Sequence, residues 1–235
     1  MYQEIIELIQ DADKLLIGIG PELKINEIDR NTSFQKVKES LSAITGTEYE
    51  IIEKIVKEKD YFIISSNVDG ALVRSGLDEN RWVTPMGNPF LFQCMEQGCD
   101  GIKDFSKNPE ALWREETVLC SKCKKEMYIN IRSKEHPETY NENGYLPQWE
   151  KYQKWLSCTL NRKLVILELG EGFKCPSLFR WPFEKTVFFN QKAKLIRVHE
   201  SLWQIGEEIK DRAICVPMNA KDFLLEYEKH ICEKG

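Results

Sequence analysis

The chain has 235 residues, of which 42% are apolar, with a formal net charge of −5 and an isoelectric point near 5.5. This length allows one large domain with a buried core and a small insert. The acidic balance excludes nucleic acid as a principal partner, because no basic field is present to attract phosphates. No apolar run approaches the length of a membrane span, and no secretory signal is recognisable. We therefore expect a cytoplasmic protein without membrane association.

The first predicted strand ends in a glycine turn. Residues 2 to 13 carry isoleucines at helical spacing and predict an amphipathic helix. Residues 14 to 17 then predict a strand that runs into Gly18-Ile19-Gly20, where glycines let the backbone turn sharply and approach a ligand. A dehydrogenase-type dinucleotide loop would need a third glycine at position 23, which is Leu23. The pair alone is equally compatible with a plain strand-to-loop turn.

A second candidate ligand loop follows the next predicted strand. Residues 33 to 59 have the periodicity of two amphipathic helices, and residues 61 to 64 that of a buried strand. This strand places Ser66, Asn67 and Asp69 at its carboxyl end, which is where ligands bind in open α/β sheets. The alternation of helices and strands predicts a parallel sheet covered on both faces.

The segment before the cysteines is expected to turn at the surface. A short helix follows Asp69, and residues 81 to 84 predict a strand. The composition of residues 85 to 89, Pro-Met-Gly-Asn-Pro, predicts a tight, exposed turn. The chain then re-enters the fold as a strand at residues 90 to 93.

Four cysteines in two closely spaced pairs predict a zinc site. They are Cys94 and Cys99, followed by Cys120 and Cys123. Four thiolates in two short knuckles satisfy a tetrahedral structural zinc ion without a further ligand. The alternatives are two disulfides or four unrelated core cysteines, which the close pairing disfavours in a chain without a secretory signal, and an Fe–S cluster, which uses other spacings. The remaining cysteines are expected to be small buried hydrophobes: Cys158, Cys175, Cys215 and Cys232.

The second half repeats the pattern of a strand followed by glycines. Residues 124 to 131 predict a returning strand of the zinc ribbon, and residues 133 to 147 a polar surface connection before a helix. The most hydrophobic strand, at residues 164 to 169, runs into Gly170-Glu171-Gly172. Two such turns at sheet carboxyl ends favour a crevice for an extended, phosphate-containing ligand. A strand ending at His199, another near residue 215 and a final helix at residues 221 to 231 complete the chain.

These elements predict an α/β fold in two parts. A Rossmann-like parallel sheet with helices on both faces takes residues 1–93 and 133–235, and a zinc-binding module takes residues 94–132. Two side-chain assignments have open alternatives. His199 is placed either to contact a ligand or only to satisfy its own hydrogen bonds. A group of aromatic residues lines an apolar channel or packs in the core: Trp181, Phe183, Phe188 and Phe189.

Together these features resemble the sirtuin family. The resemblance rests on Gly18-x-Gly20, the segment Asn67-Val68-Asp69-Gly70, the four-cysteine ribbon and Gly170-x-Gly172, and it covers most of the chain. Residues 167 to 173 and 179 to 184 are similar to a branch often encoded beside macrodomain proteins. That branch includes protein ADP-ribosyltransferases that act on lipoylated carrier proteins.

The resemblance implies that NAD binds in an extended pose between the two domains. Asn67 and Asp69 would take the nicotinamide-ribose end as the catalytic residues, and the Asp69 carboxylate is suited to accept from a carboxamide N–H. Other residues would bind the diphosphate, adenosine or neighbouring groups, with Ser66 standing where the family usually has Gln and His199 where it usually has Asn: Gly18, Gly20, Ser66, Gly170, Gly172 and His199.

The sequence departs from the family pattern at two places, and these departures bear on which of three functions the chain has. Sirtuin deacylases place a His before a Gly where this chain has Met86 before Gly87, and a thioether has no proton to exchange. The loop at residues 21 to 26 also departs from the sequence that the family has at this place. The candidates are an NAD-dependent protein mono-ADP-ribosyltransferase, a deacylase with a substituted base, and a non-catalytic module that binds NAD, ADP-ribose or a protein. An acylated or lipoylated protein is the expected substrate, and the oligomeric state is not indicated.

Overall fold

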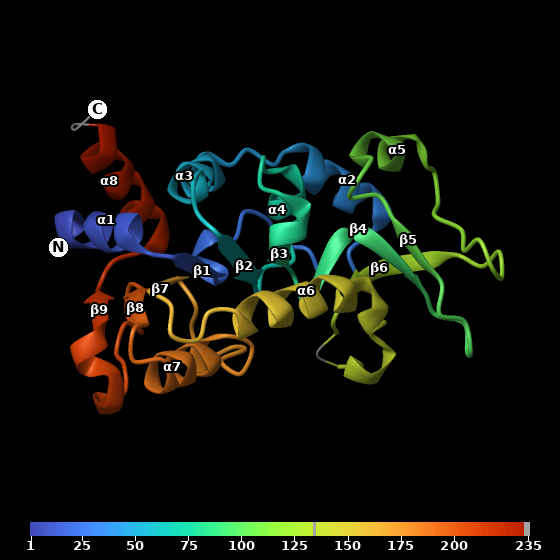
Figure 1. The fold of residues 1–235 in the computed structure, drawn as a ribbon. Helices are drawn as coiled ribbons and strands as arrows, with labels where there is room; N and C mark the ends of the chain where they lie inside the picture. Colours follow the sequence, from blue (N-terminus) through green and yellow to red (C-terminus); the bar gives the residue numbers. More distant parts are fainter. Residues whose placement is uncertain (134, 233–235) are drawn as a thin grey trace.

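A computed structural model of the protein describes residues 1–133 and 135–232. Within these residues nine strands form two sheets (Figure 1), a six-stranded parallel sheet in the order β3-β2-β1-β7-β8-β9 and a three-stranded antiparallel sheet in the order β5-β4-β6. The strands are β1 Lys14–Ile19, β2 Tyr61–Ser65, β3 Trp82–Val83, β4 Gly87–Cys94, β5 Ile102–Asp104, β6 Met127–Ile131, β7 Leu164–Leu169, β8 Lys194–Val198 and β9 Ala213–Val216.

Helices cover both faces of the large sheet, as the sequence predicts. The helices are α1 Tyr2–Asp11, α2 Phe34–Ser42, α3 Thr47–Val56, α4 Ala71–Arg74, α5 Pro109–Arg114, α6 Leu146–Ser157, α7 Arg180–Phe189 and α8 Ala220–Cys232. On one face α1, α3 and α8 pack against alternate residues of the strands, such as Leu15 and Ile17. On the other face α6 and α7 pack against the residues between them, such as Leu16. The predicted α/β class is confirmed.

The small sheet has its own core. Residues from β4, β6 and α5 pack together with α2, which the chain reaches before β2. Figure 1 shows this unit at the end of the molecule opposite the two termini. The predicted boundary at residue 94 falls at the last residue of β4, and the division of the chain into those domains stays a prediction.

The expected turn at residues 85 to 89 is present only at Pro85 and Met86, where the Gly87 N–H donates to the Thr84 carbonyl, and the expectation that the segment is exposed is wrong. β4 begins at Gly87, all of its residues are buried, and Gly87 pairs with Ile131 of β6. The ladder has an irregularity between Asn88 and Phe92, where the Asn88 Oδ1 atom accepts from the Phe90 N–H. A bulge of this kind accommodates asparagine and proline inside a sheet, so turn-forming composition is misleading here.

The expectation that the remaining four cysteines are buried is also wrong. Cys158 and Cys232 are exposed, and Cys175 and Cys215 are partly buried. Their positions explain this, because Cys158 follows the last residue of α6, Cys232 ends α8 and Cys215 lies on the edge strand β9. Within the described ranges, no helix is both long and apolar enough to cross a membrane.

Candidate functional site

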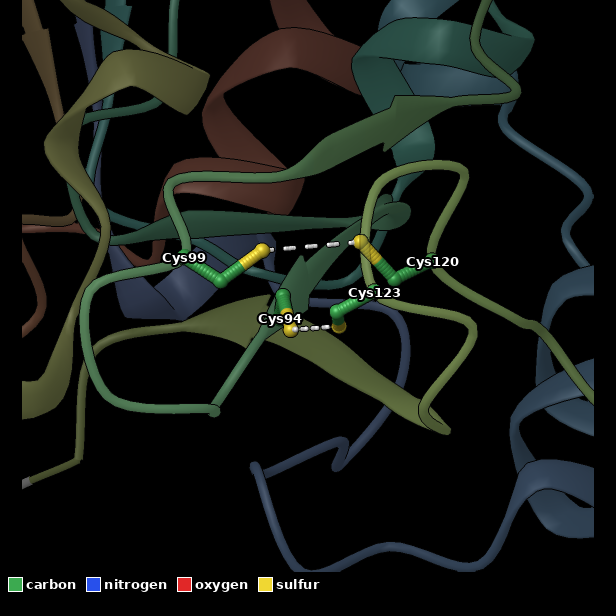
Figure 2. A group of neighbouring side chains, drawn as sticks. All are labelled: Cys94, Cys99, Cys120 and Cys123. Carbon is green, nitrogen blue, oxygen red and sulfur yellow. Dashed lines mark hydrogen bonds between the residues drawn. The ribbon is translucent and has the colours of Figure 1, made fainter.

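The four paired cysteines converge on one point of the small sheet. Figure 2 shows their side chains turned toward one another, and all four Sγ atoms lie within 4.8 Å of each other. The Sγ atoms of Cys94 and Cys123 are 3.4 Å apart, and those of Cys99 and Cys120 are 3.7 Å apart. A tetrahedral zinc ion with Zn–S bonds of about 2.3 Å needs S···S separations of about 3.8 Å. The donor set and its geometry therefore fit a structural zinc ion.

Local backbone features hold this cluster together. Lys124 adopts a left-handed conformation with φ of 64°, which closes the knuckle so that its N–H donates to the Cys120 carbonyl. The backbone N–H of Cys123 is the main cause that lowers the pKa of the Cys120 thiol, to about 7, which favours the thiolate that a metal requires. Gly101 is needed as well, because a Cβ atom there would lie 2.6 Å from the Cys120 Sγ atom.

A second feature is a cavity of about 420 Å³ beyond the carboxyl ends of the large sheet. Its wall is formed by the segment after β1, the loop after β2, the loop after β7, and the end of β6 from the small sheet. Residues that line it include Ser66, Asn67, Val68, Met86, Ile131 and Glu171. The cavity thus lies where strand ends from both sheets meet, in the size range of small-molecule sites.

Two of the predicted ligand residues line this cavity. The Asn67 Nδ2 atom donates to the Gly20 carbonyl at 2.9 Å, which joins the loop after β2 to the loop after β1. The Ser66 Oγ atom donates to Oε2 of Glu171 at 2.6 Å, which joins the loop after β2 to the loop after β7. Three segments that are distant in the sequence are therefore tied together around one cavity.

Asp69 lies beneath this loop and is not among the residues that line the cavity. Its Oδ2 atom accepts from the Ile25 N–H at 2.9 Å, and its Oδ1 atom accepts from the Ala71 N–H at 3.0 Å. Burial raises its pKa, although the two backbone donors oppose that shift. Asp69 thus fixes the segment after β1, and its predicted contact with a carboxamide stays a prediction.

The predicted glycines mainly allow the loops to pack against each other. A Cβ atom at Gly18 would lie within 2.8 Å of the Phe179 and Phe183 rings, and one at Gly20 would lie 2.4 Å from the Glu171 backbone. Gly170 has a positive φ of 67°. None of these glycines, nor Gly172, is among the described residues that line the cavity. Their predicted contacts with a nucleotide remain predictions.

His199 follows β8 at the same edge of the sheet but outside this cavity. Its Nδ1 atom accepts from the N–H groups of Ser201 and Leu202, both at 3.1 Å, and lies 3.0 Å from Oε1 of Glu22. Burial lowers the pKa of His199, so the ring is neutral near pH 7. The hydrogen-bonding alternative for His199 has support here, and a ligand contact stays a prediction.

Sequence reasoning missed the acidic residue between the second pair of glycines. Glu171 is fully buried, its Oε1 atom has no hydrogen-bond partner, and burial raises its pKa to about 7. The signal was an ionisable residue directly after the most hydrophobic strand. Beneath it, the Glu168 carboxylate accepts from Arg197 Nε at 2.7 Å and Arg180 Nη1 at 3.1 Å, and Arg180 also donates to the Glu171 carbonyl at 2.8 Å.

The arrangement of both sheets is shared with known structures. No protein-family model matches the sequence. A sirtuin solved to explain substrate affinity superposes over 99% of both chains, with a TM-score of 0.63 and 15% identity. Sir2Tm bound to a propionylated peptide superposes over 97% of both chains, with a TM-score of 0.57 and 14% identity. The fold is that of the sirtuins.

Two curated proteins are similar to this sirtuin-fold chain in sequence. A probable bifunctional ADP-ribose hydrolase/ADP-ribosyltransferase of Fusarium oxysporum f. sp. cubense is 30% identical over 156 residues, which is 60% of this chain and 26% of the relative. A protein ADP-ribosyltransferase of Staphylococcus aureus is 25% identical over 180 residues, which is 72% of this chain and 56% of the relative. The chain thus spans about a quarter and about half of the relatives it matches.

Within the sirtuin fold, the two departures seen in the sequence lie at the cavity. Met86 lines it, so no imidazole stands at that position to exchange a proton. The segment after β1 forms the short 3-10 helix Pro21–Leu23, and Lys24 with residues 27 to 31 continues along the cavity wall. The altered loop is therefore an ordered part of the site.

Proposed function

We propose that this sirtuin-fold chain binds NAD in the cavity and transfers ADP-ribose to a protein, with release of nicotinamide. The observation that carries the proposal is that Asn67 and Met86 line the same cavity, so that a ribose-binding amide is present where a proton-exchanging base is not. The similarity to two proteins named as ADP-ribosyltransferases supports the same reaction.

The residues of the cavity are suited to hold a dinucleotide. Asn67 commits its Nδ2 atom to the Gly20 carbonyl, which leaves Oδ1 to accept from a ribose hydroxyl. The orphaned Oε1 atom of Glu171 offers one further polar contact. Basic side chains that could meet the two phosphates also line the wall: Lys24, Arg30, Arg132 and Lys174.

The transfer of ADP-ribose does not depend on a general base at position 86. The bond between the ribose C1′ atom and the nicotinamide nitrogen breaks, and a bond from C1′ to a nucleophile of the acceptor forms as that nucleophile gives its proton to solvent. Such a displacement depends on positioning and charge stabilisation more than on a base. Met86 is therefore compatible with transfer, whereas it removes the group on which sirtuin deacylation depends.

The acceptor is expected to be a protein. One sirtuin neighbour is bound to a propionylated peptide, and we propose an acylated or lipoylated carrier protein as the substrate of this chain. Its reactive arm would enter the cavity beside Met86.

The test is to incubate the purified chain with NAD and acylated or lipoylated carriers, and to measure free nicotinamide and ADP-ribose bound to protein. Replacement Asn67→Ala should reduce nicotinamide release by roughly a hundredfold, as expected for loss of a positioning group. The matched control Asn143→Ala, in the exposed 3-10 helix Glu142–Gly144 outside the cavity, should leave release unchanged. Release that is the same in Asn67→Ala would contradict the proposal.

One observation favours a second candidate, a non-catalytic module that binds NAD or ADP-ribose. Both carboxylate oxygens of Asp69 already accept from backbone N–H groups, of Ile25 and Ala71, so neither is free for a carboxamide. ADP-ribose binding by calorimetry, combined with no nicotinamide release with any carrier tested, would decide for this candidate.

A further inference from the structure

Two buried glutamates, Glu168 and Glu171, differ in how far their carboxylate oxygens are hydrogen-bonded. Both oxygens of Glu168 accept from arginine side chains. Glu171 accepts at Oε2 from the Ser66 hydroxyl, while its Oε1 atom is buried and has no partner. An unpaired polar atom costs free energy in a protein interior, so its retention at a cavity wall points to a ligand that completes it.

The hydrogen bond at Oε2 of Glu171 determines which of its two oxygens can carry a proton. The Ser66 hydroxyl has one proton, and its Oγ atom lies 2.6 Å from Oε2 of Glu171 but 3.4 Å from the Ile19 carbonyl, which assigns the proton to Oε2. A proton taken up by Glu171 therefore goes to Oε1. In that form Oε1–H is a donor that needs an acceptor on the cavity side.

The surroundings of Glu171 favour the protonated form. Burial is the main cause that raises its pKa to about 7, and the Glu168 carboxylate raises it further. The Ser66 hydroxyl, the Arg180 guanidinium and the Gly172 N–H oppose the shift. Charged side chains also face the cavity from the other segments: Lys24, Arg30, Arg132 and Lys174 are basic, and Glu27, Asp29 and Glu135 are acidic.

These basic groups, together with a neutral Glu171, make the wall suitable for an anion. A phosphate oxygen can only accept, so it complements the Oε1–H donor, whereas it would be repelled by an ionised carboxylate at the same place. A ribose hydroxyl can donate or accept, so it would not require the proton.

We propose that Glu171 is a nucleotide-binding residue whose protonated carboxyl donates from Oε1 to a phosphate oxygen of the ligand. This inference rests on the nucleotide site of the proposed function. One proton is bound from solvent for each nucleotide bound by the ionised protein, and affinity falls as pH rises above the pKa of Glu171.

The test is calorimetric titration of the full chain with ADP-ribose between about pH 6 and about pH 8.5, in pairs of buffers with different heats of ionisation. The wild-type chain should take up one proton per ADP-ribose at the alkaline end, and its affinity should fall up to about tenfold per pH unit. Glu171→Gln retains an acceptor for Ser66 and a permanent N–H donor, so it should bind at the wild-type acidic affinity with no pH dependence.

Controls separate this contact from a merely structural one. Glu171→Leu should lose roughly tenfold in affinity at acidic pH, and Glu207→Gln, at the exposed start of the 3-10 helix Glu207–Arg212 outside the cavity, should keep the wild-type pH profile. Inorganic phosphate should compete with ADP-ribose for the same site.

The outcomes are distinct. Absence of ADP-ribose binding at every pH overturns the nucleotide site and this inference together. Binding without proton uptake by the wild-type chain, or a pH profile that Glu171→Gln leaves unchanged, overturns only the role of Glu171. The wild-type measurement in paired buffers decides the question even if the variants do not fold.

Discussion

The large and small sheets are stabilised in different ways. Helices cover both faces of the six-stranded sheet, and two clusters of buried aliphatic and aromatic side chains fill the space between them. The three-stranded sheet has a smaller core, in which the cysteines Cys94 and Cys120 are themselves buried members. A unit of that size buries little apolar surface, so four thiolates and a metal ion replace part of a core. Loss of the metal should therefore destabilise the three-stranded sheet and leave the six-stranded sheet folded.

The largest expected effect is that of Cys120→Ser, which removes one of four ligands from a site with binding free energy on the order of 10 kcal/mol. The purified variant should contain no zinc, and amides of β4 to β6 should lose protection from hydrogen exchange, while those of β1 and β7 retain it. Cys158→Ser is the control, because that exposed cysteine lies outside the cluster. Equal metal content in the two variants would refute the site.

A smaller but still large effect is expected within the big sheet. Glu168→Gln removes the buried carboxylate that Arg197 and Arg180 share, and leaves the fully buried Arg197 with only the partly exposed Glu184 as a charge partner. Breaking a buried pair from one side costs about 3–5 kcal/mol. Urea unfolding should report this loss, and Glu150→Gln, at an exposed position of α6, should change stability by less than about 0.5 kcal/mol. An unchanged midpoint for Glu168→Gln would show that the network is dispensable.

Glu171 should have a moderate effect with a defined pH dependence. Its pKa is about 7 in the folded chain, against 4.5 as the ordinary value. The folded state then holds its proton over a range where the unfolded chain has lost it, so stability falls as pH rises from 4.5 toward 7. Glu171→Gln should remove this fall and gain about 1–3 kcal/mol above that range. Parallel unfolding curves for both chains at every pH would contradict the raised pKa.

The smallest effect is expected on the outer face of α7. Phe189 is 73% exposed, and Trp181 and Phe188 are half exposed, whereas Phe183 alone of the four predicted aromatics is in the core. Phe189→Ser should therefore shift the free energy of unfolding by no more than about 0.5 kcal/mol. Phe183→Ala should instead cost about 3–5 kcal/mol, and a comparable loss in both would overturn the assignment of these faces.

The local pattern of the sequence was enough to predict most elements of this fold. Strands such as residues 61 to 64 and 164 to 169 are short apolar runs bounded by turn residues, and the helices show a regular apolar face, so each is recognisable within one window. Two close cysteine pairs similarly identify their metal, because the ligands of each knuckle are neighbours in the sequence. The proposed class of fold followed from the order of these elements.

The cavity depended on contacts that no local window contains. Gly18 is a glycine because the rings of Phe179 and Phe183 lie against it, Asp69 faces the Ile25 N–H instead of the cavity, and Ser66 meets Glu171. Residues 87 to 89 are buried because β6 pairs with β4. Composition and periodicity report how one segment folds, whereas hydrogen-bond partners and ionisation depend on which distant segments surround it. Those partners are set by the packing of the folded chain.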